Sequence, residues 1–199
     1  MTCDIVLAGV GGQGVLSIAA IIASAAMAEG LEARQSEVHG MAQRGGAVSA
    51  HLRLSDARVR CDLVPLGGAD LVLSMEPLES LRYASYLKPS GRIVTAAERL
   101  VNIPDYPELV SILEAVRKVP GSLVVEAEGL ARQAGSARAV NMVMVGAASP
   151  FIPVSRSGIE ASISRLFSSK DASMVEANLA AFAAGAAAAS SSAAAREGL

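Results

Sequence analysis

The sequence is poor in cysteine and aromatic residues, and it has no tryptophan. Its two cysteines, Cys3 and Cys61, are too few for a disulfide framework or for a [4Fe–4S] cluster, which takes four thiolates. No cysteine and histidine stand at zinc-site spacing, so we assign no metal ligands to this chain. Aromatic residues make up 3% of the chain, so its core must be built from Ala, Val, Leu and Ile. Two lone thiols fit a reducing compartment, and we expect a cytoplasmic protein.

Neither the charge nor the apolar segments indicate nucleic acid or a membrane as a partner. The formal net charge is −2, which gives no electrostatic attraction to polyanions. Ser17–Ala28 is apolar, but no basic segment precedes it and Asp4 stands where a signal peptide carries positive charge. Ala177–Ala195 is rich in alanine, yet Asn178 and Gly185 interrupt it, so we expect a helix whose end, at about residues 186–199, is frayed.

The apolar periodicity predicts strands that alternate with helices. Asp4–Ala8 is a short apolar run that ends at a glycine, as a strand buried on both faces does. Gln13–Ala28 lacks a wide polar face, which predicts a helix covered on more than one side, in part by a partner subunit. Glu32–Val38 follows as the second strand. Val48–Leu54 and Val59–Leu63 alternate between apolar and polar residues, which predicts an antiparallel hairpin.

The rest of the chain continues this alternation and ends in helices. We expect strands at residues 70–75, 92–95 and 123–125, and helices at residues 77–87, 108–118, 126–134, 139–148, 157–168 and 172–188. Residues 1–199 then form a single domain. The predicted fold class is α/β, a Rossmann-like, doubly wound, mostly parallel sheet with an antiparallel hairpin and a helical C-terminal part.

A first glycine-rich segment follows the first predicted strand. Gly9, Gly11 and Gly14 fit the pattern G-x-G-x-x-G between a strand and a helix, with Gly12 and Gln13 inside it. Without side chains, the backbone amides at the start of the helix are open to a phosphate or a carboxylate. The alternative is that these glycines only allow close packing of the strand and the helix.

A second glycine-rich segment, Ser36–Gly46, follows the second predicted strand. Because the loops after parallel strands emerge at the same edge of a sheet, both segments are expected at one ligand-binding edge. Arg44 is suited to planar anions, and Gly45 gives its loop room to approach a ligand. For the single histidine of the segment, pinning of the loop is favoured over catalysis, because it lacks a fixed partner. The predicted cofactor-binding residues of this segment are His39, Gln43, Arg44, Gly45 and Gly46.

Other polar residues have structural interpretations. Glu76, Glu79 and Arg82 stand three residues apart at a helix start, where an ion pair and the helix dipole account for them. His51 is expected to be ordinary surface, and Asn141 is expected to bond the backbone within the core. No G-x-S-x-G, P-loop, HExxH or Gly-Asp-Gly thiamine-anchor motif is present. We therefore assign no catalytic residue.

Two further functions stay open at this point. A free-standing NAD-binding Rossmann protein would use Gly9, Gly11 and Gly14 with an acidic residue about 20 positions on. Glu37 stands 23 residues after Gly14, although Gln13 inside the glycine loop is unusual for that fold. A small ligand-binding module without a redox role is the other alternative.

The motifs together resemble the small, β- or γ-type subunit of 2-oxoacid:ferredoxin oxidoreductases. Within that family the sequence is most similar to the indolepyruvate ferredoxin oxidoreductase β subunit, and the likeness covers about residues 4–185. The stretch Glu37–Gly46 is its most specific part, and it separates this branch from γ subunits of pyruvate, 2-oxoglutarate or ketoisovalerate oxidoreductases. The passages that carry it are Gly9–Leu16, Ser36–Gly46, Glu76–Arg82, Asn141–Ala147 and Asn178–Gly185.

The resemblance implies a subunit of an enzyme that converts a 2-oxoacid and coenzyme A to an acyl-CoA, carbon dioxide and reduced ferredoxin. Thiamine diphosphate, Mg and the [4Fe–4S] clusters would reside on a large partner subunit. This chain would be inactive alone, bind no cofactor by itself, and meet ferredoxin and coenzyme A through the complex. In isolation it could form a homodimer.

Overall fold

The computed structural model describes residues 1–39 and 45–197, and it contains one six-stranded sheet. The strands lie in the order β2-β3-β1-β4-β5-β6. β1 pairs in parallel with β4, β4 with β5, and β5 with β6. Their bounds are β1 Thr2–Val10, β2 Glu32–His39, β3 Ala47–Ser55, β4 Ala69–Ser74, β5 Leu87–Ala96 and β6 Leu123–Val125.

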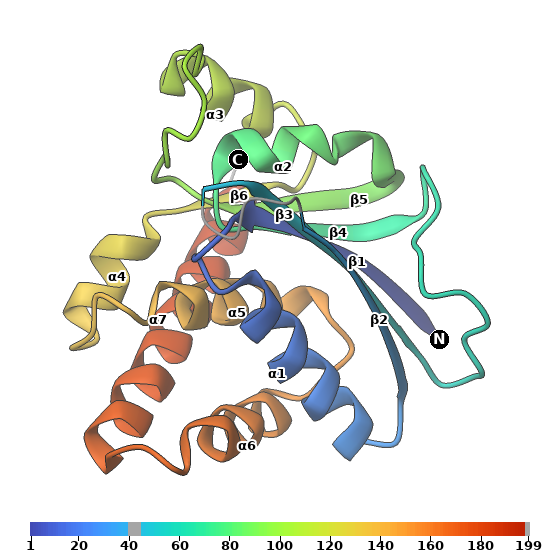
Figure 1. The fold of residues 1–199 in the computed structure, drawn as a ribbon, viewed down its shortest axis with the longest axis vertical. Helices are drawn as coiled ribbons and strands as arrows, with labels where there is room; N and C mark the ends of the chain where they lie inside the picture. Colours follow the sequence, from blue (N-terminus) through green and yellow to red (C-terminus); the bar gives the residue numbers. More distant parts are fainter. Residues whose placement is uncertain (40–44, 198–199) are drawn as a thin grey trace.

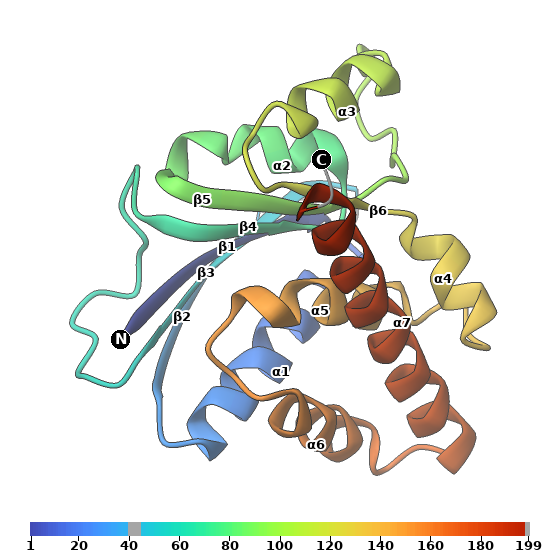
Figure 2. The ribbon, with the colours of Figure 1, turned by 180° about the vertical axis from the view of Figure 1, so that it is seen from behind.

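Helices cover both faces of the sheet, as Figures 1 and 2 show. α2 and α3 lie on one face, and α1, α5, α6 and α7 lie on the other. The bounds are α1 Val15–Ala28, α2 Pro77–Arg82, α3 Leu109–Arg117, α4 Ala127–Gln133, α5 Val140–Ala148, α6 Arg156–Phe167 and α7 Ala172–Glu197, with short 3-10 turns at Ala84–Tyr86 and Ser149–Phe151. The α/β class, the mostly parallel sheet and the helical C-terminal part are confirmed.

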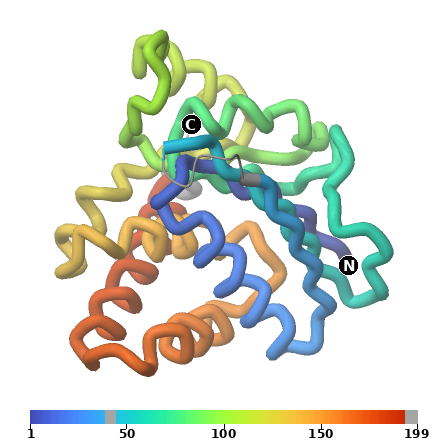
Figure 3. The backbone as a smooth tube through the Cα atoms, viewed as in Figure 1, coloured from blue at the N-terminus to red at the C-terminus, as the bar shows by residue number. Residues whose placement is uncertain are grey.

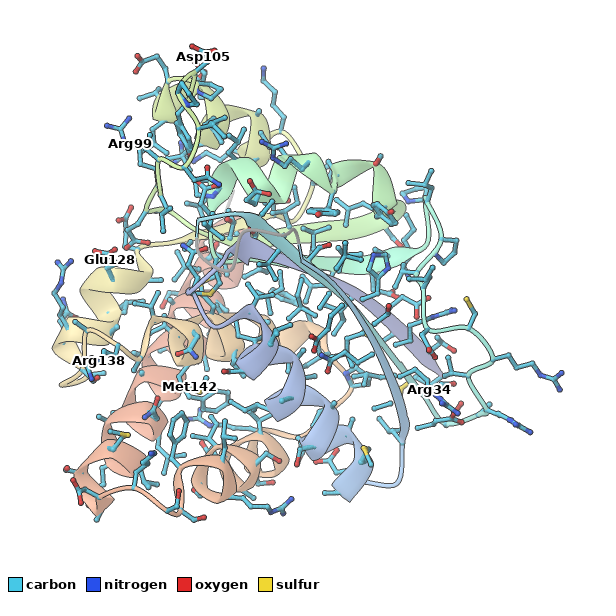
Figure 4. The ribbon with its side chains drawn as sticks, in the orientation of Figure 1. Arg34, Arg99, Asp105, Glu128, Arg138 and Met142 are labelled. Carbon is cyan, nitrogen blue, oxygen red and sulfur yellow. The ribbon has the colours of Figure 1, made fainter. Side chains whose placement is uncertain are left out.

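The larger core lies between the sheet and α1, α5 and α7. Ile5 and Leu7 of β1 point into it, whereas Val6 points into the smaller core beneath α2 and α3. This alternation follows from the period of two along a strand. Met142, labelled in Figure 4, is fully buried in the larger core, so the methionines of α5 serve packing.

Glycines let α5 and α7 approach closely. A Cβ on Gly185 would lie 1.9 Å from the carbonyl oxygen of Val143, and one on Gly146 would lie 2.0 Å from that of Phe182. Small residues at the crossing therefore bring the two backbones into contact.

Residues Ala172–Ser192 of α7 are long and apolar enough to cross a membrane, with a mean hydropathy of 1.2. Phe182 of this helix is fully buried, and 28% of the apolar window as a whole is buried.

The predicted hairpin is wrong in one of its strands. β3 pairs antiparallel with β1 on one side and with β2 on the other, and Val59–Leu63 forms a loop instead of a strand. The hairpin is thus made by β2 and β3. The alternating pattern of Val59–Leu63 predicted a strand, but the Val59 amide bonds a side chain in place of a neighbouring strand. It donates to the Glu32 carboxylate at 3.1 Å.

Candidate functional site

The first glycine segment forms a tight turn between β1 and α1. A Cβ on Gly9 would lie 2.8 Å from Val15 Cγ2, so this position requires glycine for packing. Gly12 and Gly14 have φ angles of 105° and 80°, in the left-handed region that favours glycine. No atom of residues 1–39 or 45–197 lies within 4 Å of a Cβ built on Gly12, so the described part of the chain leaves its backbone uncovered. Packing explains Gly9, but it does not explain the open position at Gly12.

The Gln13 side chain fixes the shape of this turn. Its Oε1 accepts a hydrogen bond from the Val10 amide at 2.7 Å, and its Nε2 donates to the Met75 carbonyl oxygen at 3.2 Å. Gln13 thereby joins the ends of β1 and β4, which are parallel neighbours. This pair of hydrogen bonds accounts for a glutamine inside the glycine loop.

The two glycine segments meet at one edge of the sheet, as expected from the sequence. The Gly11 amide donates to the Gly46 carbonyl oxygen at 2.8 Å, and the Gly45 amide donates to the Gly11 carbonyl oxygen at 3.5 Å. β1 and β2 both run antiparallel to β3, so their carboxyl ends point to the same edge. In Figure 3 the end of β1, which carries Gly9, and the start of β3, directly after Gly46, lie side by side in this region.

Seven of the ten predicted site residues are described together at this edge, namely Gly9, Gly11, Gly12, Gln13, Gly14, Gly45 and Gly46. His39 ends β2, and its side chain lies outside the described part of the chain. Gln43 and Arg44 also lie outside the described residues. Their place in the site stays a prediction.

Two asparagines complete the edge that the glycines form. Asn102 Nδ2 donates to the Gly45 carbonyl oxygen at 3.1 Å. Asn141 lies at the start of α5 with its Nδ2 2.9 Å from the Cβ position of Gly14, and its Oδ1 accepts from the Met142 amide at 3.1 Å. The sequence pattern did not link either asparagine to the glycine segments, because both contacts join residues far apart in the chain.

Buried carboxylates lie at the end of β4. Glu76 is the N-cap of α2, and its Oε2 accepts from the Glu79 amide at 2.8 Å. The hydroxyl of Tyr106 donates to Glu76 Oε1, and burial followed by this carboxylate raises the pKa of the tyrosine. Glu79 pairs with Arg82 at 3.1 Å, but burial raises the pKa of its carboxyl. The predicted ion pair is therefore confirmed for Glu79 and Arg82, the Glu76 cap is an additional finding, and Tyr106 ties the 97–108 segment to Glu76.

His51 is a correction to the sequence analysis, since only 5% of it is exposed. Its Nδ1 accepts a hydrogen bond from the Val64 amide at 3.0 Å, and Tyr86 packs against its ring edge-on at a centroid distance of 5.3 Å. The 56–68 loop covers this face of β3, so an alternating pattern did not mean exposure. Burial lowers the pKa of His51.

The arrangement of strands differs from that of an NAD site. Glu37 lies on β2, and β3 stands between β2 and β1. The acidic residue that binds the ribose in a dinucleotide fold normally follows the strand next to the glycine loop. Here two inter-strand spacings, about 10 Å, separate β2 from β1. This geometry disfavours NAD binding.

The edge presents backbone amides and no metal cluster. α1 begins at Val15, and no side chain among the described residues caps its N-terminus. The positive end of a helix and its free amides favour an anion. Residues 1–39 and 45–197 hold no group of three or more His, Cys, Asp or Glu that could bind a metal ion. Burial raises the pKa of the Cys3 thiol to about 12, and Cys61 lies in an exposed loop, so the pair does not fit a cluster.

Comparison with known proteins decides the family. The profile of the pyruvate ferredoxin/flavodoxin oxidoreductase family matches residues 4–188. The chain belongs to this family. It is 44% identical over 153 residues to indolepyruvate oxidoreductase subunit IorB of Archaeoglobus fulgidus, covering 73% of this chain and 75% of that one. It is 36% identical over 194 residues to subunit IorB of Methanothermobacter thermautotrophicus, covering 93% and 96%.

A solved structure of an oxidoreductase shares the fold of this chain. The 2-oxoglutarate:ferredoxin oxidoreductase of Magnetococcus marinus, with 2-oxoglutarate, coenzyme A and succinyl-CoA bound, matches with a TM-score of 0.75 at 23% identity. The match covers 96% of this chain but 31% of that longer chain. The resemblance inferred from the glycine segments is therefore confirmed, and the fold forms part of a longer chain in that enzyme.

Proposed function

We propose that this chain is the small subunit of a 2-oxoacid:ferredoxin oxidoreductase of the indolepyruvate type. Its 44% identity to an indolepyruvate oxidoreductase subunit supports this branch over the γ subunits of pyruvate, 2-oxoglutarate or ketoisovalerate oxidoreductases. The complete enzyme would convert an arylpyruvate and coenzyme A to an acyl-CoA, carbon dioxide and reduced ferredoxin. The enzyme would work in the cytoplasm, in keeping with two free thiols.

The chain would contribute a wall of the active-site cleft. The junction of Gly11 with Gly46 supports this role, since it places both glycine segments and the uncapped start of α1 on one edge. Open amides at a helix start suit a phosphate group of coenzyme A or of thiamine diphosphate. Arg44 would add a bidentate anion contact from the second segment.

The cofactors of the reaction would be held by a large partner subunit. Thiamine diphosphate supplies carbanion stabilisation in such enzymes, and iron–sulfur clusters carry the electrons. The described residues offer neither a metal-binding cluster nor four thiolates. This chain would instead bind and orient a phosphate group beside the cofactors and would exclude water from the cleft.

Reconstitution tests the proposal. The chain would be expressed alone and together with the large subunit of its complex, and each preparation assayed for CoA-dependent reduction of ferredoxin with four substrates: indolepyruvate, pyruvate, 2-oxoglutarate and ketoisovalerate. We expect turnover only in the complex, with the highest kcat/KM for indolepyruvate. A higher kcat/KM for another of these acids would replace the arylpyruvate assignment, and failure of the two chains to co-purify would contradict the subunit role.

A further inference from the structure

The 97–108 segment follows β5 at the edge of the sheet where the two glycine segments meet. β5 runs parallel to β4, which runs parallel to β1, so the three strands end at the same edge. Arg99 and Asp105, labelled in Figure 4, lie on this segment, which contains no helix or strand. Its Asn102 donates to the Gly45 carbonyl oxygen at 3.1 Å. The place of the second glycine segment therefore depends on what holds Asn102.

The Glu76 carboxylate holds the segment on both sides of Asn102. Its Oε1 accepts a hydrogen bond from the Tyr106 hydroxyl, and the Leu100 amide donates to the same oxygen at 3.5 Å. The chain between these two donors thus closes a loop on one oxygen atom, and Asn102 lies within that loop. Pro104 lies between Asn102 and Tyr106, and its fixed φ angle stiffens the connection.

Glu76 is a rigid anchor, because its other polar atoms are bonded as well. The residue is 1% exposed. Its Oε2 accepts from the Glu79 amide at 2.8 Å. Its backbone amide donates to the Ser74 hydroxyl oxygen at 3.2 Å, and its carbonyl oxygen accepts from the same hydroxyl at 2.6 Å. Loss of the Tyr106 hydroxyl should therefore release the 97–108 segment and leave Glu76 in place.

These contacts close a ring of hydrogen bonds around the edge of the site. Gln13 of the first glycine segment donates to the carbonyl oxygen of Met75, the residue directly before Glu76. The first glycine segment bonds the second through both backbone groups of Gly11. The second segment bonds the 97–108 segment, which returns to Glu76. A site keeps its geometry when such supporting bonds fix it, so loss of one link should loosen the segments beside it.

We infer that Tyr106 is a positioning residue for the candidate phosphate site at this edge. Its bond to Glu76 holds the loop that carries Asn102. Asn102 in turn holds the second glycine segment, at the Gly45 carbonyl oxygen, beside the open amides of the first. This inference rests on the proposed function, because it takes the site to bind a phosphate of coenzyme A or of thiamine diphosphate. Tyr106 acts through Asn102 and needs no contact with the ligand.

Three variants and a control separate this role from a purely stabilising one. Tyr106→Phe keeps the aromatic ring and removes the bond to Glu76. Asn102→Ala removes the bond to the second glycine segment, and a double variant carries both changes. Tyr83→Phe, the same substitution at the C-terminal end of α2, is the matched control. Thermal unfolding of each isolated chain checks that it folds.

Amide hydrogen exchange in the isolated chain reports on the second glycine segment without the large subunit. The Gly11 amide donates to the Gly46 carbonyl oxygen, and the Gly45 amide donates to that of Gly11, so both amides should exchange faster when this segment loosens. Tyr106→Phe and Asn102→Ala should each raise both rates about fivefold, as loss of one hydrogen bond implies. The double variant should raise them no further, and Tyr83→Phe should leave them unchanged.

The complex with the large subunit gives the readout for function. Tyr106→Phe should raise the KM for the compound whose phosphate the site binds about fivefold. It should leave kcat and the KM for indolepyruvate within about twofold of the wild type. Asn102→Ala should do the same, and Tyr106→Phe should have no further effect in the Asn102→Ala background. A purely stabilising tyrosine would show neither this coupling nor a change in one KM alone.

Two results would overturn the inference. One is that Tyr106→Phe behaves as Tyr83→Phe does in both exchange and KM. The other is that the effects of Tyr106→Phe and Asn102→Ala add up in the double variant, because the two residues would then act independently. If the wild-type complex shows no turnover, the proposed function fails and the exchange rates alone decide. Coupled rises in exchange would then support the positioning role of Tyr106, and unchanged or additive rates would overturn it.

Discussion

The Gly11 amide donates a hydrogen bond to the Gly46 carbonyl oxygen at 2.8 Å, although 35 positions separate the two residues in the chain. The bond lies directly beyond the last pair of the β1–β3 ladder, Val10 with Ala47. Both glycine segments are thereby continuous with the sheet. The candidate wall is built on rigid strands, so changes in it should have separable effects on stability and on the reaction.

Gln13 is expected to stabilise the turn. Gln13→Ala leaves the Val10 amide and the Met75 carbonyl oxygen without this partner, and it should lower the free energy of unfolding by about 1–2 kcal/mol. Urea unfolding of the isolated chain measures the change. Gln133→Ala, at an exposed position of α4, is the control and should change stability by less than about 0.5 kcal/mol. Equal losses of stability in both variants would argue against a stabilising role for the two Gln13 hydrogen bonds.

The crossing of α5 and α7 should not accept a methyl group. A Cβ at Gly185 would lie 1.9 Å from the Val143 carbonyl oxygen, so Gly185→Ala should cost about 2–3 kcal/mol by forcing the helices apart. Gly129 in α4 has nothing within 4 Å of its Cβ position, so Gly129→Ala should stabilise the chain by about 0.5–1 kcal/mol. Denaturant titration compares the two. A stabilising Gly185→Ala would show that the crossing is looser than described.

His51 should make stability fall in mild acid. Burial lowers its pKa from the ordinary value of 6.5, so the folded chain resists a proton that the unfolded chain accepts. Its contribution is complete above about pH 6.5 and is lost as the pH falls through the lower folded pKa. His51→Asn keeps an acceptor for the Val64 amide but does not titrate. Between about pH 7.5 and 5.5, Tm should fall less in the variant than in the wild type; parallel curves would contradict this.

Sequence reasoning placed the two glycine segments at one edge of the sheet, because glycine and period-two patterns are local signals. The strand before Gly9 and the helix after Gly14 follow from short apolar runs, and the position of β2 follows from a similar pattern. The insertion of β3 between β2 and β1 has no local signal, since strand order is set by tertiary pairing. For the same reason, burial of His51 under the 56–68 loop could not be predicted.

The contacts of Asn102 with Gly45 and of Asn141 with Gly14 also lie beyond local patterns. Each joins segments separated by more than 50 residues. The stretch Asn141–Ala147 draws attention to Asn141 as a polar residue before an apolar run. Only the fold shows that this asparagine faces Gly14.

The most direct test of the central claim, that open amides of this chain bind a phosphate of coenzyme A or of thiamine diphosphate in the cleft of a larger enzyme, is the pair of KM values for these two compounds in the complex carrying Gly12→Ala. Gly30→Ala is the matched control, because Gly30 has a φ of 84° and equally open surroundings at the other end of α1. Both variants should lose about 1 kcal/mol of stability through backbone strain. The account predicts that the KM for the compound whose phosphate these amides bind rises about tenfold in Gly12→Ala alone, which corresponds to about 1.4 kcal/mol of binding. Identical KM values for both compounds in the two variants would contradict it.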